Sequence, residues 1–260
     1  MANTIADKLT YLNGTKDAIK QAIIGKGVDV SDTDTFRSYA DKITSIQSGG
    51  SLAGAPSGIR FSNSTFTTVP VEIIPYLEAQ TDLGGIFMRC NSLTTVPLFN
   101  TNRATDMSNM FNGCMSLQTL QLLDTSNVVD MHYMFPDCRA LKTVPQFNTS
   151  KVTTMNGMFT SCASLQTVPL LDTSNVDSMS FIFSDCPSLT NLGGFTGLKL
   201  NLDLSNSSKL TVDSVMNVIN NAADMTSSPK TLTLSQDVFQ KLTQEQIATA
   251  SAKGWNIGAI

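Results

Sequence analysis

The sequence predicts an α/β repeat protein: a solenoid of 24-residue coils, preceded by a small helical segment and closed by an α/β cap. When the chain is shifted against itself by 24 residues, apolar residues of the same kind fall into register. All five cysteines of the chain stand in one column, with a phenylalanine column three residues before it and a leucine column three residues after it. The aligned residues are Phe87, Phe111, Phe135, Phe159 and Phe183; Cys90, Cys114, Cys138, Cys162 and Cys186; and Leu93, Leu117, Leu141, Leu165 and Leu189.

The length of the repeat predicts how the coils are built. A 24-residue unit cannot bury a core alone, so successive units must stack and share one. A period of this length falls in the range of leucine-rich repeats, which favours a solenoid of that type. Stretches such as "LKTVP" favour strands of one parallel sheet, which should end at the column of Pro97, Pro145 and Pro169, because proline lacks a ladder donor. The "MxxMFxxC" stretch on the return side is predicted to form a short helix or 3₁₀ turn.

Composition changes along the chain predict the domain boundaries. Helical spacing of apolar residues marks the first segment, and "SGGSLAGAPSG" has the composition of a flexible linker. After the repeats, the pattern predicts a strand at Leu200 to Leu204, a helix from Thr211 to about Ala223, a strand in "TLTLS" and a final helix from about Thr243. The predicted parts are a helical segment at 1–47, a linker at 48–58, an irregular N-terminal cap coil at 59–82, five repeats at 83–197 and a C-terminal cap at 198–260.

Composition and charge exclude several classes of function. With 41% hydrophobic and 15% charged residues, the chain is predicted to be globular. Its formal net charge of -4 leaves no basic field for nucleic acid. No apolar window is long enough for a membrane span, so membrane insertion is not expected. The opening "MANTIADKLTYLNG" does not resemble a secretory signal, which predicts a chain made in the cytosol and not exported by that route.

The cysteine column is interpreted as part of the core. Neighbouring strands of a sheet lie about 4.8 Å apart, so one thiol per coil makes an interior ladder and not a convergent cluster. A zinc site usually needs four ligands around one point, often from close CxxC pairs, and the chain has no CxxC. Disulfides between adjacent coils remain an alternative because that separation is within the range a bridge accepts. A metal site remains a third alternative.

No residue pattern predicts catalysis. The column of Asn100, Asp124, Asn148 and Asp172 follows the strand and is interpreted as turn-forming, with calcium binding as the alternative. Asp124 and Asp172 are two coils apart, near the carboxylate separation of an inverting glycosidase, but any column of acids would give that spacing. The single histidine, His132, is expected to be an exposed side chain. We therefore predict no enzyme activity, no cofactor and no metal.

The candidate binding residues are outward positions that vary from coil to coil. Arg103, Asn127, Lys151 and Asn175 share one position, and His132 and Asn156 share another. A constant scaffold with changing outward residues is how repeat proteins present binding faces, although drift without constraint gives the same pattern. These six residues are the predicted ligand contacts.

The repeat unit "LxxVPxF(D/N)TSxVxxMxxMFxxC" resembles the BspA-like leucine-rich repeats of bacterial surface proteins and many phage-encoded proteins. The resemblance covers residues 83–195, where "VPLFNT", "LLDTSNV" and "SMSFIFSDCPSL" carry it. The first coil departs from the pattern, with Leu83 and Ile86 in place of methionine, and the last departs at "GGFTGLKL". The segment "LNGTKDAIKQAIIGKGVDVSDTDTFRSYADKI" is similar to the start of many phage tail and virion-decorating proteins.

These resemblances imply a function. The chain is expected to be a non-enzymatic phage virion protein, a head or tail fibre or a decoration protein, assembled in the host cytoplasm. Its first segment would join other virion proteins, and its repeats would bind a host-surface glycan or protein. Fibres of this kind are usually homotrimers, which would give the N-terminal helices a surface to pack against. Two alternatives are a bacterial surface adhesin and a glycan depolymerase.

Overall fold

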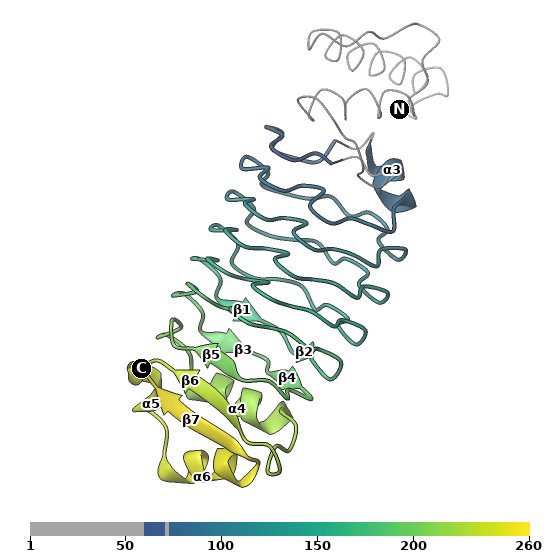
Figure 1. Cartoon of the computed structure of the whole chain (residues 1–260). Coiled ribbons are helices and arrows are strands. Elements are labelled where there is room, and N and C mark those ends of the chain that lie inside the picture. Colours follow the sequence, from purple (N-terminus) through teal and green to yellow (C-terminus); the bar gives the residue numbers. More distant parts are fainter. Residues whose placement is uncertain (1–59, 71–72) are drawn as a thin grey trace, which may run out of the picture. The chain divides into compact units, whose positions relative to one another are not determined.

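The computed structural model describes residues 60–70 and 73–260. The predicted helical segment at 1–47 and linker at 48–58 lie outside the described residues. Residues Ser62–Ile260 form one compact unit, a stack of coils that follow one another in chain order (Figure 1). Helix α3 (Ile74–Ala79) precedes the first regular coil.

Successive coils are joined by backbone hydrogen bonds at the repeat spacing. Parallel bridges link Asp82 to Asp106, Asp106 to Asp130, Asp130 to Thr154 and Thr154 to Ser178. The amide of Phe111 donates to the carbonyl of Met134 (2.9 Å), and the amide of Phe135 donates to the carbonyl of Met158 (2.9 Å). Since these partners are 23 residues apart, each coil satisfies part of its backbone through its neighbours and the rest through its own turns, as in the bond from the Cys114 amide to the Phe111 carbonyl (3.0 Å).

The regular strands are short and parallel. Strand β1 (Thr167–Val168) pairs with β3 (Asn191–Leu192), and β2 (Leu171–Asp172) pairs with β4 (Phe195–Thr196). In the earlier coils the same columns form only isolated bridges, such as Thr143 with Thr167. The predicted single parallel sheet is therefore reduced to two-residue pairs. Strand β1 ends just before Pro169, as predicted, because proline has no amide hydrogen to extend the ladder.

The core is made of the predicted columns. All five phenylalanines of the Phe87 column are at most 1% exposed, and adjacent rings stack with centroids 5.5 to 5.7 Å apart. The ring planes of Phe135 and Phe159 are parallel, at 0°. Stacking of the rings at the coil spacing adds a favourable ring-to-ring interaction to the free energy gained by burying each ring. A single aromatic type repeated in register thus gives a continuous core.

The return side of each coil differs from the prediction. The "MxxMFxxC" stretches form consecutive turns instead of a helix or 3₁₀ segment. Two positions in each coil have positive φ: one column is Gly85, Asn109, Tyr133, Gly157 and Phe181, and the other is Arg89, Gly113, Asp137, Ser161 and Asp185. Left-handed residues four positions apart interrupt any helical hydrogen bonding. The repeated methionines gave the spacing of these turns but not their conformation.

The C-terminal part forms a three-stranded parallel sheet with helices. Strand β5 (Leu202–Leu204) pairs with β6 (Lys230–Leu234), which pairs with β7 (Trp255–Ala259). Helix α4 (Val212–Asn221) is capped by Thr211, α5 (Gln236–Phe239) by Ser235, and α6 (Gln244–Ala252) by a capping box at Thr243. Strands β5 and β6 and helices α4 and α6 were predicted from the sequence, whereas strand β7 and helix α5 were not.

One lysine ties this sheet to the preceding helix. The Lys253 ammonium group donates to the carbonyls of Ile219 (2.8 Å), Asn220 (3.0 Å) and Ala222 (2.8 Å) at the end of α4. The indole of buried Trp255 donates to the carbonyl of Ala223 (3.0 Å). These donors satisfy carbonyls that the end of a helix leaves without partners.

The cysteine thiols point into the core. All five are 0% exposed, and the Sγ atoms of Cys114, Cys138, Cys162 and Cys186 each donate to a phenylalanine carbonyl of the preceding coil at 3.0 to 3.1 Å. Burial raises the pKa of the Cys90 thiol to about 11 and that of the Cys186 thiol to about 12, and it raises the pKa of the three thiols between them as well. All five are free, as the interior-ladder interpretation predicts.

We expect no cysteine to react with a water-soluble disulfide reagent in the folded protein at about pH 8, because each thiol is buried and protonated below its raised pKa. All five should react after unfolding in guanidinium. Counting modified thiols by absorbance before and after denaturant tests this. Stoichiometric reaction of any thiol in the folded protein would contradict it.

We expect Lys253→Met to destabilise the protein by about 1 to 3 kcal/mol, since three helix-end carbonyls lose a charged donor. Lys241→Met, which removes an exposed lysine of the same region, is the matched control and should change stability by less than about 0.5 kcal/mol. Urea unfolding of both variants measures the difference. Equal midpoints for the two variants would contradict the role of Lys253.

Candidate functional site

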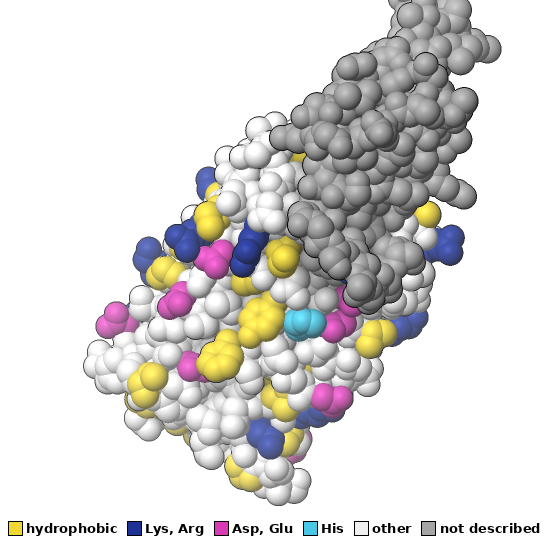
Figure 2. Space-filling model, turned by 45° about the horizontal axis from the view of Figure 1, so that its top comes forward, with side chains coloured by type: hydrophobic (Ala, Val, Ile, Leu, Met, Phe, Trp, Pro, Cys, Tyr) yellow, Lys and Arg dark blue, Asp and Glu magenta, His cyan; other side chains and the backbone are white. Residues whose placement is uncertain are grey.

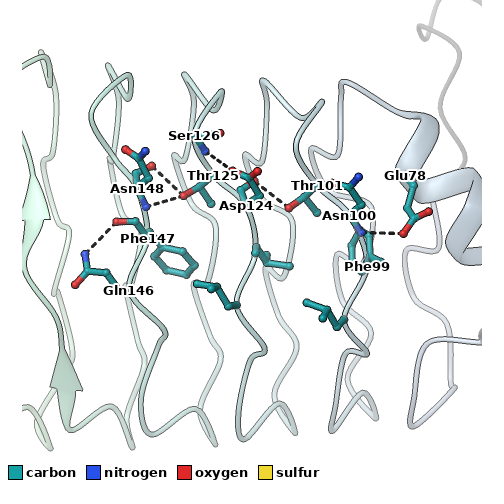
Figure 3. Close-up of a pocket in the computed structure, with 13 residues that line it drawn as sticks. Glu78, Phe99, Asn100, Thr101, Asp124, Thr125, Ser126, Gln146, Phe147 and Asn148 are labelled. Carbon is teal, nitrogen blue, oxygen red and sulfur yellow. Dashed lines mark hydrogen bonds between the residues drawn. The ribbon is translucent and has the colours of Figure 1, made fainter.

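A groove of about 770 Å³ lies along one bend of the first regular coils (Figure 3). Equivalent positions of successive coils line it, with buried Phe99, Leu123 and Phe147 beneath. Leu98 and Leu122, by contrast, are 69% and 58% exposed. The groove therefore offers apolar side chains to a ligand along several coils, with polar side chains beside them.

A ladder of buried threonines fixes the polar side of the groove. The Thr101 hydroxyl donates to the carbonyl of Asp124 (2.9 Å), and the Thr125 hydroxyl donates to the carbonyl of Asn148 (2.9 Å). The Asn148 amide in turn donates to the Thr125 hydroxyl (2.8 Å; Figure 3). Each threonine thus bonds the next coil, which holds the groove's polar groups at a constant spacing.

The predicted turn residues lie on this bend. The side-chain oxygens of Asn100, Asp124, Asn148 and Asp172 each accept the backbone amide two residues on. Hydrogen bonds from Ser126 lower the pKa of the Asp124 carboxyl. At the end of the groove, the Glu78 carboxylate of α3 accepts the Asn100 amide (2.8 Å). The turn interpretation is confirmed, because these oxygens serve the chain's own backbone.

The first set of predicted binding residues joins coils to one another. The Asn127 side chain donates to the carbonyl of Asn102 (2.7 Å), and the Asn175 side chain donates to the carbonyl of Ser150 (2.7 Å). The Lys151 ammonium donates to the Asn127 side-chain oxygen (2.7 Å). Arg103 is exposed at the start of this column. Apart from Arg103, these polar groups take part in stacking, which the sequence alone did not indicate.

The second set lies on the return side. His132 is half-buried rather than exposed, and its Nδ1 lies 2.7 Å from Asp130 Oδ1. Its Nε2 lies 3.3 Å from the side-chain nitrogen of Asn109. The side-chain oxygen of Asn109 accepts a hydrogen bond from the Asn112 side chain, which orients the Asn109 amide group. Both ring nitrogens lie within hydrogen-bond distance of neighbouring side chains, which holds the ring in place.

Asn156 is also engaged within the chain. Its side-chain nitrogen donates to Thr154 (3.2 Å), and its oxygen accepts from the Ser178 hydroxyl (2.6 Å) and the Ser180 amide (2.9 Å). The structure brings Asn127 and Lys151 into contact but leaves His132 and Asn156 in a different column. The six predicted residues thus do not form one site.

Sequence reasoning missed two aromatic residues beside this second column. Tyr133 is 40% exposed and Phe181 is 70% exposed, and both have positive φ (51° and 59°). Their position is occupied by Gly85, Asn109 and Gly157 in other coils, and this glycine and asparagine pattern was the available signal. A left-handed conformation costs an aromatic residue about 1 kcal/mol, and Phe181 gains little burial in return. Figure 2 shows the histidine in cyan beside hydrophobic side chains in yellow on this face.

Within residues 60–70 and 73–260, no group of three His, Cys, Asp or Glu side chains could hold a metal ion. In the same described part of the chain, no helix has the length and apolar character to cross a bilayer. Two outward faces are the candidate binding sites: the groove, and the aromatic face of Tyr133 and Phe181.

The fold and these faces define a protein made of stacked 24-residue coils with mixed α/β content and small parallel sheets. Residues 81–195 and 138–252 match the family described as "Mycoplasma protein of unknown function, DUF285", and the two matches together span more than half of the chain. The chain belongs to this family. No curated protein matched it.

Among solved structures, the chain is similar to a leucine-rich repeat protein from Bacteroides ovatus ATCC 8483, with 14% sequence identity and a TM-score of 0.25. The similarity covers 68% of this chain and 48% of that protein. The chain therefore spans about half the length of that protein.

We expect opposite effects from two substitutions in the positive-φ column. Phe181→Asn should raise the stability by about 0.5 to 1 kcal/mol, because asparagine tolerates this conformation and little packing is lost. Gly157→Ala should lower the stability by about 1 to 3 kcal/mol. The added Cβ would lie 2.2 Å from a Tyr133 ring carbon, and the positive φ of this position would strain the alanine backbone. Urea midpoints test both. A Phe181→Asn variant that is clearly less stable than the parent would show that the ring contributes to packing.

Proposed function

We propose that this chain is a non-enzymatic phage virion protein, a head or tail fibre or a decoration protein, whose repeats form a BspA-like leucine-rich-repeat solenoid that binds the host cell surface. The observation that carries the proposal is a row of exposed apolar side chains beside the groove, outside the constant core. Phenylalanine and cysteine recur in every coil of the core, whereas the exposed column beside the groove reads Leu98, Leu122, Gln146 and Leu170. Gln146 of this column donates to the Leu170 carbonyl of the next coil (2.6 Å), whereas the exposed leucine side chains are open to a ligand.

A binding role is also supported by the exposed apolar groups. Leu98 and Leu122 lie over a polar ladder that is already satisfied by coil-to-coil hydrogen bonds. Exposed apolar groups rimmed by polar ones are typical of interaction surfaces. The rigidity of the threonine ladder lowers the entropy cost of binding, because the groove has little freedom to lose.

The hydrogen bonding of the acids favours binding over hydrolysis. Asp124 and Asp172 each accept amides and hydroxyls of their own bend. Hydrogen bonds from Ser126 lower the pKa of the Asp124 carboxyl, whereas a glycosidase needs one carboxylic acid that keeps its proton near neutral pH. The only histidine has both ring nitrogens engaged. The Asp124 and Asp172 pair, whose spacing suggested a depolymerase, therefore does not favour that alternative.

The location in the virion rests on the first segment. Its resemblance to the start of phage tail and virion-decorating proteins suggests that residues 1–47 join other virion proteins, with assembly in the host cytoplasm. A homotrimer would let these predicted helices bury their apolar faces against one another. The repeats would then contact a host-surface glycan or protein.

Three measurements test the proposal. In particles purified from a phage that encodes the chain, mass spectrometry should find it at stoichiometric level. Light scattering should give a trimer for the full chain and a monomer for a 59–260 fragment, whose circular dichroism should show that it folds. Finding the chain in a bacterial envelope and not in particles would favour an adhesin instead, and release of sugar from host capsule would favour a depolymerase.

A further inference from the structure

We propose that Tyr133 and Phe181 form a platform that binds the apolar face of a neutral polysaccharide. This inference rests on the proposed surface-binding function and names the ligand class and the site. It concerns the return side of the coils rather than the groove at the opposite bend.

The two rings are displayed, not buried. Phe181 is 70% exposed and Tyr133 is 40% exposed, although aromatic side chains are usually covered in a folded core. The ring of Tyr133 lies against the backbone of Gly157 in the next coil, since a Cβ built on that glycine would lie 2.2 Å from Cε1 and 2.5 Å from Cδ1. A glycine at that place lets the ring lie close to the coil surface. One ring face is therefore supported and the residue still has a large exposed fraction.

The rings are held on a fixed backbone. The Tyr133 amide donates to the carbonyl of Asn156 (2.8 Å), and the Phe181 carbonyl accepts the Thr160 hydroxyl (2.8 Å). The His132 ring meets the Tyr133 ring edge to face, with centroids 5.8 Å apart. Rigid aromatic residues lose little conformational freedom on binding, so their contact area converts efficiently into affinity.

The surroundings fit a sugar better than a protein partner. A pyranose ring has an apolar face of C–H groups and a rim of hydroxyl groups. The Tyr133 hydroxyl and the hydroxyl of exposed Ser180, the residue before Phe181, are hydrogen-bonding groups suited to such a rim. Protein partners usually place their main anchors in well-packed pockets, whereas Phe181 is 70% exposed.

Charge selects among polysaccharides. Asp106 and Asp130 follow one another in the column just before this turn, and Asp130 contacts His132. Acidic side chains in magenta lie close to the histidine in Figure 2. Like charges repel an anionic polymer at this face, so the platform favours a neutral one.

Native affinity electrophoresis of the full chain in gels that contain β-glucan, mannan or galactan tests the inference, with polygalacturonate as the anionic comparison. At least one neutral polymer should retard the protein, and polygalacturonate should not. The double variant Y133N/F181N should bind the same polymer about tenfold more weakly or not at all. Asparagine occurs at this position as Asn109, so the variant should fold, as circular dichroism and a thermal melt will show. The variant L98N/L122N tests the groove as the competing site, and the matched control I260N changes a 79% exposed apolar side chain of the C-terminal part and should bind like the parent.

The outcomes separate this inference from the proposed function. Loss of retardation in Y133N/F181N alone supports the platform. Equal retardation of parent and Y133N/F181N, or loss only in L98N/L122N, overturns it and moves glycan binding elsewhere on the same surface protein. If no neutral polysaccharide retards the parent, the inference is overturned, while detection of the chain in purified particles would still support the virion assignment with a protein receptor.

Discussion

The register between neighbouring coils is the constraint on which the rest of the structure depends. Each coil is too short to satisfy its own backbone, so amides such as that of Phe111 find their acceptors 23 residues further on. A change of length in any coil would shift every ring, thiol and carbonyl of that coil against its neighbours. The parallel stack of Phe135 on Phe159 and the thiol bonds to phenylalanine carbonyls are consequences of that register.

The same constraint separates the residues that the stack needs from those available for binding. The threonine ladder, the Asn127 and Lys151 contact and the His132 network all link one coil to the next. Variation of a surface residue is therefore a poor guide to ligand contact, since several variable side chains stabilise the stack. Exposed apolar residues are a better guide, because most of the surface of Leu98, Leu122 and Phe181 is open to a partner.

The end of the stack requires a different solution from its middle. The last coil has no successor to satisfy its backbone, and helix α4 packs there against β3 and β4. Ser214 of α4 donates its hydroxyl to the carbonyl of Thr190 and accepts the Leu192 amide. Lys253 and Trp255 then fix the end of α4 to the final strand. Side chains thereby replace the backbone partners that another coil would supply.

The sequence by itself determined the period, the interior columns, the turn role of the Asp124 column and most elements of the C-terminal part, because burial and turn chemistry depend on residue type at fixed spacing. Tertiary structure decided the rest. Whether Asn127 or Asn156 is free to bind depends on atoms of the neighbouring coil, which spacing does not specify. The positive φ of Tyr133 and Phe181 is likewise imposed by the stack, since aromatic residues do not favour it and the register leaves no other path for the chain.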